Sequence, residues 1–163
     1  YMAKKYKSVT TVGPVSWAKL YEHDRDEHGY NGAYEECDGA YTIDQELSKE
    51  EFAKLSEAGS LKRPKGKYLM DGKIVVGFAR KHKVMFRGEV LEAASGPPVL
   101  LDADGQPWNG DAIGNGSVCA VTNLLSFFTA PNGDPSCRTT MIEVKVMEHV
   151  IYDPDAADVE EAA

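Results

Sequence analysis

The chain has 163 residues, 42% of them hydrophobic, which is enough for one compact domain with a buried core but too little for two. No apolar stretch approaches the roughly 20 residues that cross a bilayer, and the basic N-terminus lacks the apolar run of a signal peptide, so we expect an intracellular protein without membrane contact. The formal net charge of −8 excludes a nucleic-acid partner only if the charge is spread evenly along the chain.

The first part of the chain predicts two strands separated by a loop. Residues 9–22 mix β-branched, aromatic and polar side chains and are interrupted only by Gly13 and Pro14, which predicts a strand with a kink or bulge. Residues 23–32 are rich in charge and glycine and are expected to form a loop. Residues 40–47 alternate imperfectly between apolar and polar side chains, so they are predicted to form the second strand.

A single short helix is predicted after the second strand. Ser48 and Glu51 have the spacing of a capping box, and Phe52 and Leu55 supply an apolar stripe before Gly59 ends the helix.

The segment after this helix predicts a basic loop and a strand. Residues 62–66 contain three cations and a proline, which indicates a loop. In residues 73–84, Ile74, Val76 and Phe78 share one face, as the side chains of a strand do.

The last third of the chain also predicts strands. Residues 131–135 contain an Asn-Gly pair, which favours a tight hairpin between two long strands. The predicted segments are a short strand at 99–102, a turn at 102–105, a glycine-rich bend at 113–117, and long strands at 118–130 and 138–152. This order predicts an all-β fold with one short helix, in which an antiparallel barrel is capped by a helix between its second and third strands.

We expect one domain, residues 1–152, followed by an acidic tail, residues 153–163. The tail carries five acids and no base, so it is expected to be disordered. At the other end, Tyr1 precedes Met2, and we expect Met2 to be the natural first residue.

The charge is strongly polarised along the sequence. Between Lys62 and Arg87 there are nine cations and one acid, Asp71, so this stretch carries nine minus one, or +8, and holds half of the basic residues of the chain. Between Glu22 and Glu57 there are twelve acids and three cations. The negative net charge therefore does not exclude a nucleic-acid partner.

Aromatic rings interleave with the cations of the basic stretch, and this combination is typical of single-strand binders, in which bases stack on rings and cations meet phosphates. Adjacent residues of a strand point to opposite sides, so one ring of the Phe127–Phe128 pair must face outward. Trp108 lies in a loop, where it either stacks on a base or covers one end of the barrel. The candidate DNA-binding residues are Lys62, Arg63, Lys65, Lys67, Tyr68, Phe78, Arg80, Lys81, Lys83, Phe86, Arg87, Trp108, Phe127 and Phe128.

Catalytic and metal-binding patterns are weak in this sequence. The three cysteines have no metal-site spacing and are expected to be reduced, structural thiols. His23, His28 and Cys37 match no recognised ligand spacing, and the glycine-rich bend lacks the spacing of a phosphate-binding loop. We therefore expect no enzyme activity, no metal and no cofactor.

The segments Val99–Trp108 and Ile113–Ser117, followed by the long hairpin that ends at Val150, resemble the replication single-stranded DNA-binding proteins of tailed bacteriophages. This resemblance implies an OB fold and sequence-independent binding in a groove, to which Phe78, Arg80 and Lys81 and the Phe127–Phe128 pair are expected to contribute. It also implies a role in replication, recombination, repair and strand annealing.

The resemblance further implies that the acidic tail contacts the replication machinery. Partners such as a DNA polymerase or helicase would recognise its acids, which are Asp153, Asp155, Asp158, Glu160 and Glu161. The resemblance places the protein in the cytoplasm of an infected bacterium, and a homodimer is possible. Two alternatives remain open, namely an OB-type protein-interaction module and a metal-dependent nuclease.

Overall fold

The structure, a computed structural model, describes residues 5–152. The acids of the predicted tail lie outside the described residues. The strands are β1 (Lys5–Lys19), β2 (Ala40–Leu47), β3 (Ile74–Lys81), β4 (Met85–Phe86), β5 (Glu89–Val90), β6 (Val99–Leu101), β7 (Val118–Thr129) and β8 (Pro135–Glu148). The α-helices are α1 (Lys49–Ala58) and α2 (Gly66–Leu69), and the 3-10 helices are η1 (Glu22–Asp24), η2 (Tyr30–Gly32) and η3 (Glu92–Ala94).

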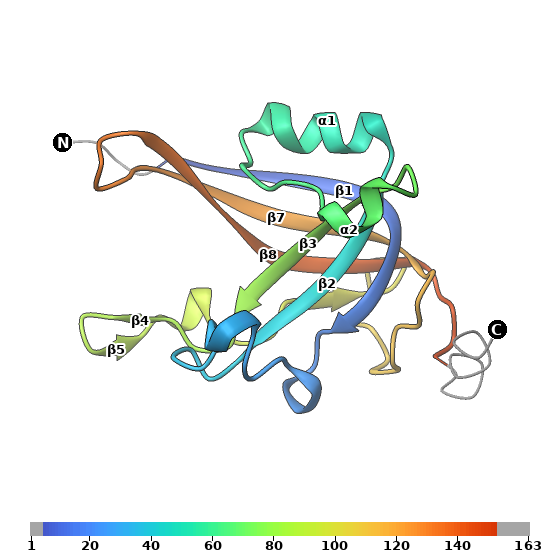
Figure 1. The fold of residues 1–163 in the computed structure, drawn as a ribbon. Helices are drawn as coiled ribbons and strands as arrows, with labels where there is room; N and C mark the ends of the chain where they lie inside the picture. Colours follow the sequence, from blue (N-terminus) through green and yellow to red (C-terminus); the bar gives the residue numbers. More distant parts are fainter. Residues whose placement is uncertain (1–4, 153–163) are drawn as a thin grey trace.

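Six of these strands form one curled sheet in the order β3-β2-β1-β7-β8-β6, while β4 and β5 form a separate two-stranded ribbon (Figure 1). The pairs β3–β2, β2–β1, β1–β7 and β7–β8 are antiparallel, but β6 pairs with β8 in parallel. In the described part of the chain no ladder of hydrogen bonds joins β3 to β8. The mostly-sheet prediction is confirmed, but β6 departs from the predicted antiparallel order.

β1 bends where the sequence predicts a kink. Its residues up to Pro14 pair with β7, and its residues from Val15 onward pair with β2. A Cβ atom on Gly13 would collide with the backbone carbonyl of Glu46, so this close crossing of two strands requires glycine. The bend lets β1 pair with β7 in one wall of the curled sheet and with β2 in the other wall.

The core lies between these two walls. Its largest fully buried side chains include Tyr41, Phe78 and Met141, which come from different strands. The buried amide of Gln45 is also satisfied, because its Oε1 accepts from the Thr11 hydroxyl at 2.6 Å and its Nε2 donates to the Cys119 carbonyl at 2.9 Å. These bonds join β1, β2 and β7 across the interior.

α1 follows β2 and precedes β3 along the chain, as predicted, and packs against β1. The Ser48 hydroxyl accepts from the backbone N–H of Glu51 at 3.1 Å, and Gly59 ends the helix with φ of 114°. The carboxylate of Glu51 does not return to the cap, as it would in a complete capping box. It accepts instead from the backbone N–H of Val12 at 2.7 Å and thereby ties α1 to β1.

The prediction of a single helix is wrong, and the ribbon of β4 and β5 was not predicted. α2 has only four residues, which is too short to produce a recognisable apolar stripe. The ribbon of β4 and β5 has two residues in each strand, and all four are exposed, so it carries no burial pattern. Its turn has positive φ at Arg87 (52°) and Gly88 (80°), as the commonest tight hairpins require.

The described helices are all too short or too polar to span a membrane. All three cysteines are free thiols. Burial raises the pKa of Cys119 to about 12, so this thiol stays protonated at neutral pH.

Candidate nucleic-acid interface

The outer face of β1, β2 and β3 carries small and polar side chains in register. One row across the three strands contains Lys19, Thr42 and Ala79, and the next contains Ser16, Asp44 and Gly77. Val75 and Lys81 extend this face toward the two ends of β3. Because alternate residues of a strand share a face, the opposite face of the same strands supplies the core.

Two acids of β2, Asp44 and Glu46, lie on this face, and Asp44 at its middle is neutralised. The Nζ atom of Lys65 lies 2.8 Å from Oδ1 of Asp44, and the lysine side chain passes over Gly77. The backbone N–H of Lys65 also donates to the carbonyl of Val75 at 2.7 Å, which fixes the basic loop against β3. Lys65 therefore removes a negative charge that would repel a phosphate, instead of offering a free cation.

An aromatic ring with a cation above it lies at each end of β3. At the α2 end, Nζ of Lys67 lies 5.0 Å from the ring centroid of Tyr68. At the ribbon end, the guanidinium carbon of Arg87 lies 5.1 Å from the ring centroid of Phe86, which is 54% exposed. β3 has eight residues and so spans about 26 Å between these two pairs.

Other exposed cations follow the same path. They are Arg63 in the loop after α1, Lys73 before β3, Lys81 at its end and Lys83 before the ribbon. We use the name β3 surface for this set of residues: Lys19, Arg63, Lys65, Lys67, Tyr68, Lys73, Lys81, Lys83, Phe86 and Arg87. It offers cations to phosphates and two rings to bases along the length of one strand.

Two residues of the predicted groove are not available to a ligand. Phe78 is 1% exposed and belongs to the core. Arg80 is 9% exposed, and its guanidinium donates to the carbonyls of Gly96 (2.8 Å), Ala93 (3.0 Å) and Ser95 (3.1 Å). Arg80 thus fixes the segment that returns from the ribbon, and burial lowers its pKa.

Lys62 and Trp108 also differ from free contact residues. Lys62 is half-buried, and burial lowers the pKa of its ammonium group. The indole N–H of Trp108 donates to the carbonyl of Asp111 at 2.9 Å, and its ring packs edge-on against His149 at 4.9 Å between centroids. Trp108 also contacts the core, so it covers one end of the curled sheet, which is the second of its two predicted roles.

The structure separates Phe127 from Phe128. Phe127 packs against the core and lies so close to Gly59 that a Cβ atom there would collide with its ring. Phe128 points to the other face of the β7–β8 hairpin, where the guanidinium carbon of Arg138 lies 5.2 Å from its ring centroid. Phe128 is therefore the outward ring of the predicted pair, and the two rings do not share one groove.

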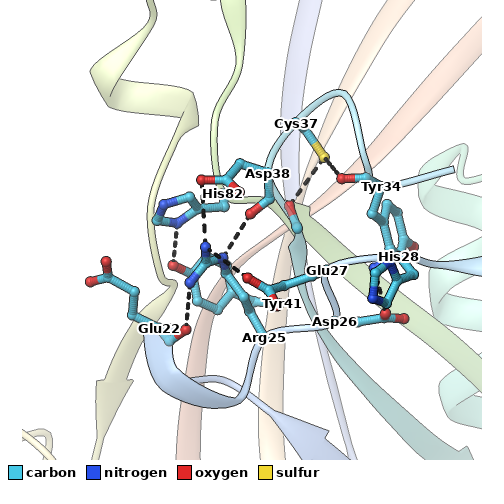
Figure 2. A network of polar contacts seen from close by, with 11 residues as sticks. Glu22, Arg25, Asp26, Glu27, His28, Tyr34, Cys37, Asp38, Tyr41 and His82 are labelled. Carbon is cyan, nitrogen blue, oxygen red and sulfur yellow. Dashed lines mark hydrogen bonds and ion pairs between the residues drawn. The ribbon is translucent and has the colours of Figure 1, made fainter. Parts of the chain in front are cut away.

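The acidic loop between β1 and β2 is held in place by its own charges (Figure 2). Arg25 donates from Nε to the Asp38 carbonyl and from Nη1 to the Glu22 carbonyl, both at 2.7 Å, and Nη2 lies 3.4 Å from Oε1 of Glu27. The loop ends beside β3, where the Tyr41 hydroxyl lies 2.6 Å from Nδ1 of His82.

This loop does not assemble a metal site from the residues that the structure describes. The Cys37 thiol donates to the carbonyls of Tyr34 and Gly39, at 3.4 and 3.1 Å. Across residues 5–152 no three side chains of the ligand types gather closely enough to hold an ion.

Sequence reasoning missed two exposed residues of β1, of which Lys19 belongs to the outer face. Lys19 enters it through the pairing of β1 with β2 opposite Thr42. Trp17 lies in a bulge of β1 with φ of 54°, and its backbone N–H donates to Oδ1 of Asn115 at 2.9 Å. A tryptophan two residues before a lysine, in a strand already predicted to be kinked, was the available signal.

No protein-family model matches the chain, and no curated protein sequence matches it. Solved structures do. gp2.5, a single-stranded DNA-binding protein encoded by bacteriophage T7, aligns with a TM-score of 0.58 at 15% identity, covering 98% of this chain and 96% of that one. The single-stranded DNA-binding protein from bacteriophage Enc34 aligns with a TM-score of 0.51 at 12% identity, covering 96% and 89%. The chain therefore shares the fold of bacteriophage single-stranded DNA-binding proteins.

Proposed function

We propose that this protein binds single-stranded DNA without sequence preference, and that it coats strands during phage DNA replication, recombination and annealing. The observation that carries the proposal is the β3 surface, where a cation lies over a ring at both ends of one strand, over half-buried Tyr68 at one end and exposed Phe86 at the other. The shared fold with two proteins described as single-stranded DNA-binding supports it.

The proposed contacts follow from the chemistry of the β3 surface. An extended single strand lies along β3, with bases stacked on Tyr68 and Phe86 and phosphates met by the cations beside these rings. Between the rings, Lys65 lies over Gly77 and neutralises Asp44, so no unpaired charge at the middle of β3 repels a phosphate. Backbone phosphates and ring faces are common to all sequences, so such a surface discriminates little between bases.

The same geometry favours single strands over duplex. A base stacks on Tyr68 or Phe86 only if its own face is free, and in a duplex both faces are covered by neighbouring bases. We propose that the sheet acts as an OB-type barrel capped by α1, because that fold presents its second and third strands to oligonucleotides.

We also propose that the protein acts by binding alone, without catalysis, in the cytoplasm of the infected bacterium. The acids of residues 153–163 would recruit a polymerase or helicase, and two copies of the chain would associate as a homodimer. The polarised charge supports a tail that competes for the β3 surface, since five acids oppose its cations.

Titration with labelled oligonucleotides tests the proposal. We expect single-stranded 20-mers of different sequence to bind with similar affinity and duplex to bind much more weakly, with log affinity falling linearly with log salt by about 0.7 per phosphate neutralised. Equal affinity for duplex, or affinity that does not depend on salt, would refute the proposal.

A further inference from the structure

The outer face of the β7–β8 hairpin carries a second group of aromatic and cationic side chains. Tyr6 of β1 pairs with Ser126 of β7, and Ser126 pairs with Arg138 of β8, so these three side chains lie side by side on one face. Phe128 pairs with Ser136 one step further toward the hairpin tip and lies under Arg138. We call Tyr6, Phe128 and Arg138 the hairpin strip.

The hairpin strip is open to solvent. Tyr6 is 58% exposed, and Arg138 is exposed and has no ion-pair partner among the side chains of residues 6–152. Phe128 is half-buried beneath it. Two rings, and a guanidinium that lies over one of them, are thus presented together on the surface.

Hydroxyl groups flank the strip on the side away from the tip, and one acid, Asp134, faces Ala130 on the tip side. The next row away from the tip contains Ser8, Leu124 and Thr140, and the row after it contains Thr10, Thr122 and Glu143. Away from the tip, Glu143 is the first acid on this face, and two rows of antiparallel sheet place it about 13 Å from the Tyr6 row. Serine and threonine hydroxyls and arginine are among the usual contacts of backbone phosphates.

The hairpin strip is separate from the β3 surface. β3 and β8 are not paired, and the core lies between the wall that contains β2 and β3 and the wall that contains β7 and β8. The opposite face of the hairpin is already occupied, because Phe127 packs beside Gly59 and the Thr139 hydroxyl lies 2.7 Å from that of Ser60. A ligand on the strip therefore cannot be the same short segment that lies along β3.

We propose that the hairpin strip is a second binding site for a segment of single-stranded nucleic acid. Bases would stack on Tyr6 and Phe128, while Arg138 and the neighbouring hydroxyl groups would meet the phosphates. This proposal rests on the proposed function, since it gives one chain two strand-binding surfaces. The hairpin strip has two rings and one cation, whereas the β3 surface has more cations. The strip should therefore bind a single strand more weakly than the β3 surface does.

Stoichiometry with a short strand tests the proposal. Native mass spectrometry and calorimetric titration of the whole chain with an 8-nucleotide oligo(dT) should give two bound strands, one tight and one weak. The double variant Tyr6→Leu/Arg138→Gln should weaken the second binding event about tenfold or more and leave the first unchanged. Phe86→Leu/Arg87→Gln should weaken the first and leave the second.

Two residues outside the strip, half-buried Lys145 and exposed Tyr30, provide matched controls. Lys145→Gln removes a cation of β8 on the same outer face but far from the tip, and Tyr30→Leu removes an 88% exposed ring in the acidic loop. Both should leave the two binding events unchanged.

The outcomes separate the two proposals. One bound strand that is lost only in Phe86→Leu/Arg87→Gln overturns the hairpin strip and leaves the proposed function standing. Two bound strands that both survive Tyr6→Leu/Arg138→Gln also overturn the strip. If only one strand binds and its binding is lost only in Tyr6→Leu/Arg138→Gln, the assignment of the hairpin strip stands and that of the β3 surface is overturned. If an acidic protein partner, and no oligonucleotide, bound at the strip, the proposal would likewise fail.

Discussion

Phe127 and Phe128 are neighbours in β7, and the structure predicts opposite consequences for replacing each of them with alanine. The Phe127 ring packs against the core and beside Gly59, where it supports the end of α1. The Phe128 ring lies on the outer face under Arg138 and is not among the side chains that pack against the core. The pair therefore separates stability from binding within two adjacent residues.

The magnitudes follow from burial. Removing a fully buried phenylalanine costs about 3–5 kcal/mol, and Phe127 is only half-buried, so we expect about 3 kcal/mol, or a fall in Tm of roughly 6–12 °C for a chain of this length. Phe128→Ala removes an exposed cation–π contact and should shift Tm by no more than about 2 °C.

Binding should respond in the opposite way. Base stacking on one ring contributes about 1–3 kcal/mol, so Phe128→Ala should weaken oligonucleotide binding at the hairpin strip by roughly 5-fold to 150-fold. Phe127→Ala, measured well below its Tm, should bind as the unmodified chain does. Thermal unfolding followed by circular dichroism, with oligonucleotide titration at 25 °C, gives both values. A large loss of stability in Phe128→Ala with intact binding would refute this assignment of the two rings.

Three further variants test other contacts. Arg80→Lys keeps the charge but loses the geometry of three carbonyl bonds, so Tm should fall by roughly 4–8 °C while DNA affinity stays within about twofold; a selective loss of affinity would return Arg80 to the binding surface. Burial raises the pKa of Glu51, but the hydrogen bonds from Val12 and Lys54 together lower that pKa by more than burial raises it. The folded-state pKa of Glu51 therefore lies below the ordinary value. The ionised Glu51 therefore stabilises the fold by about 1 kcal/mol above its unfolded-state pKa of about 4.3, and this stabilisation is lost as pH falls through its folded-state pKa. The Glu51→Gln variant should accordingly have a lower Tm than the unmodified chain at pH 7, and the two Tm values should converge in acid. A chain ending after Tyr152 should bind single strands more tightly, most clearly at low salt, and an unchanged low-salt affinity would remove the competition by the tail.

Much of the fold could be predicted because its signals are local. The glycine and proline of β1 mark its bend, the Ser48 cap and Gly59 bound α1, and the Asn-Gly pair of residues 132–133 lies in the hairpin of β7 and β8. Each of these depends on the conformational preferences of a few residues in sequence.

The β4–β5 ribbon and the parallel pairing of β6 could not be predicted in the same way. The ribbon buries nothing, so no periodicity marks it, and the partner of β6 lies more than 40 residues away along the chain. Parallel pairing depends on tertiary packing, which a local pattern does not contain.

The candidate site was predictable in composition but not in geometry. The cluster of cations and rings between Lys62 and Arg87 is visible in the sequence, but the role of each side chain depends on its partner. Arg80 meets three carbonyls and Lys65 meets a carboxylate, and these contacts come from segments that the sequence does not place together. Lys19 and Tyr6 enter the two surfaces only through strand register.

The most direct test of the β3 surface is the salt dependence of single-strand binding after three of its exposed cations are neutralised. Lys67→Gln/Lys73→Gln/Arg87→Gln should reduce the slope of log affinity against log salt by about 2, because each phosphate contact contributes about 0.7. The control Lys49→Gln/Lys145→Gln, which neutralises cations outside this surface, should keep the original slope. An unchanged slope in the triple variant, or an equal reduction per charge in the control, would contradict the claim that phosphates lie along β3.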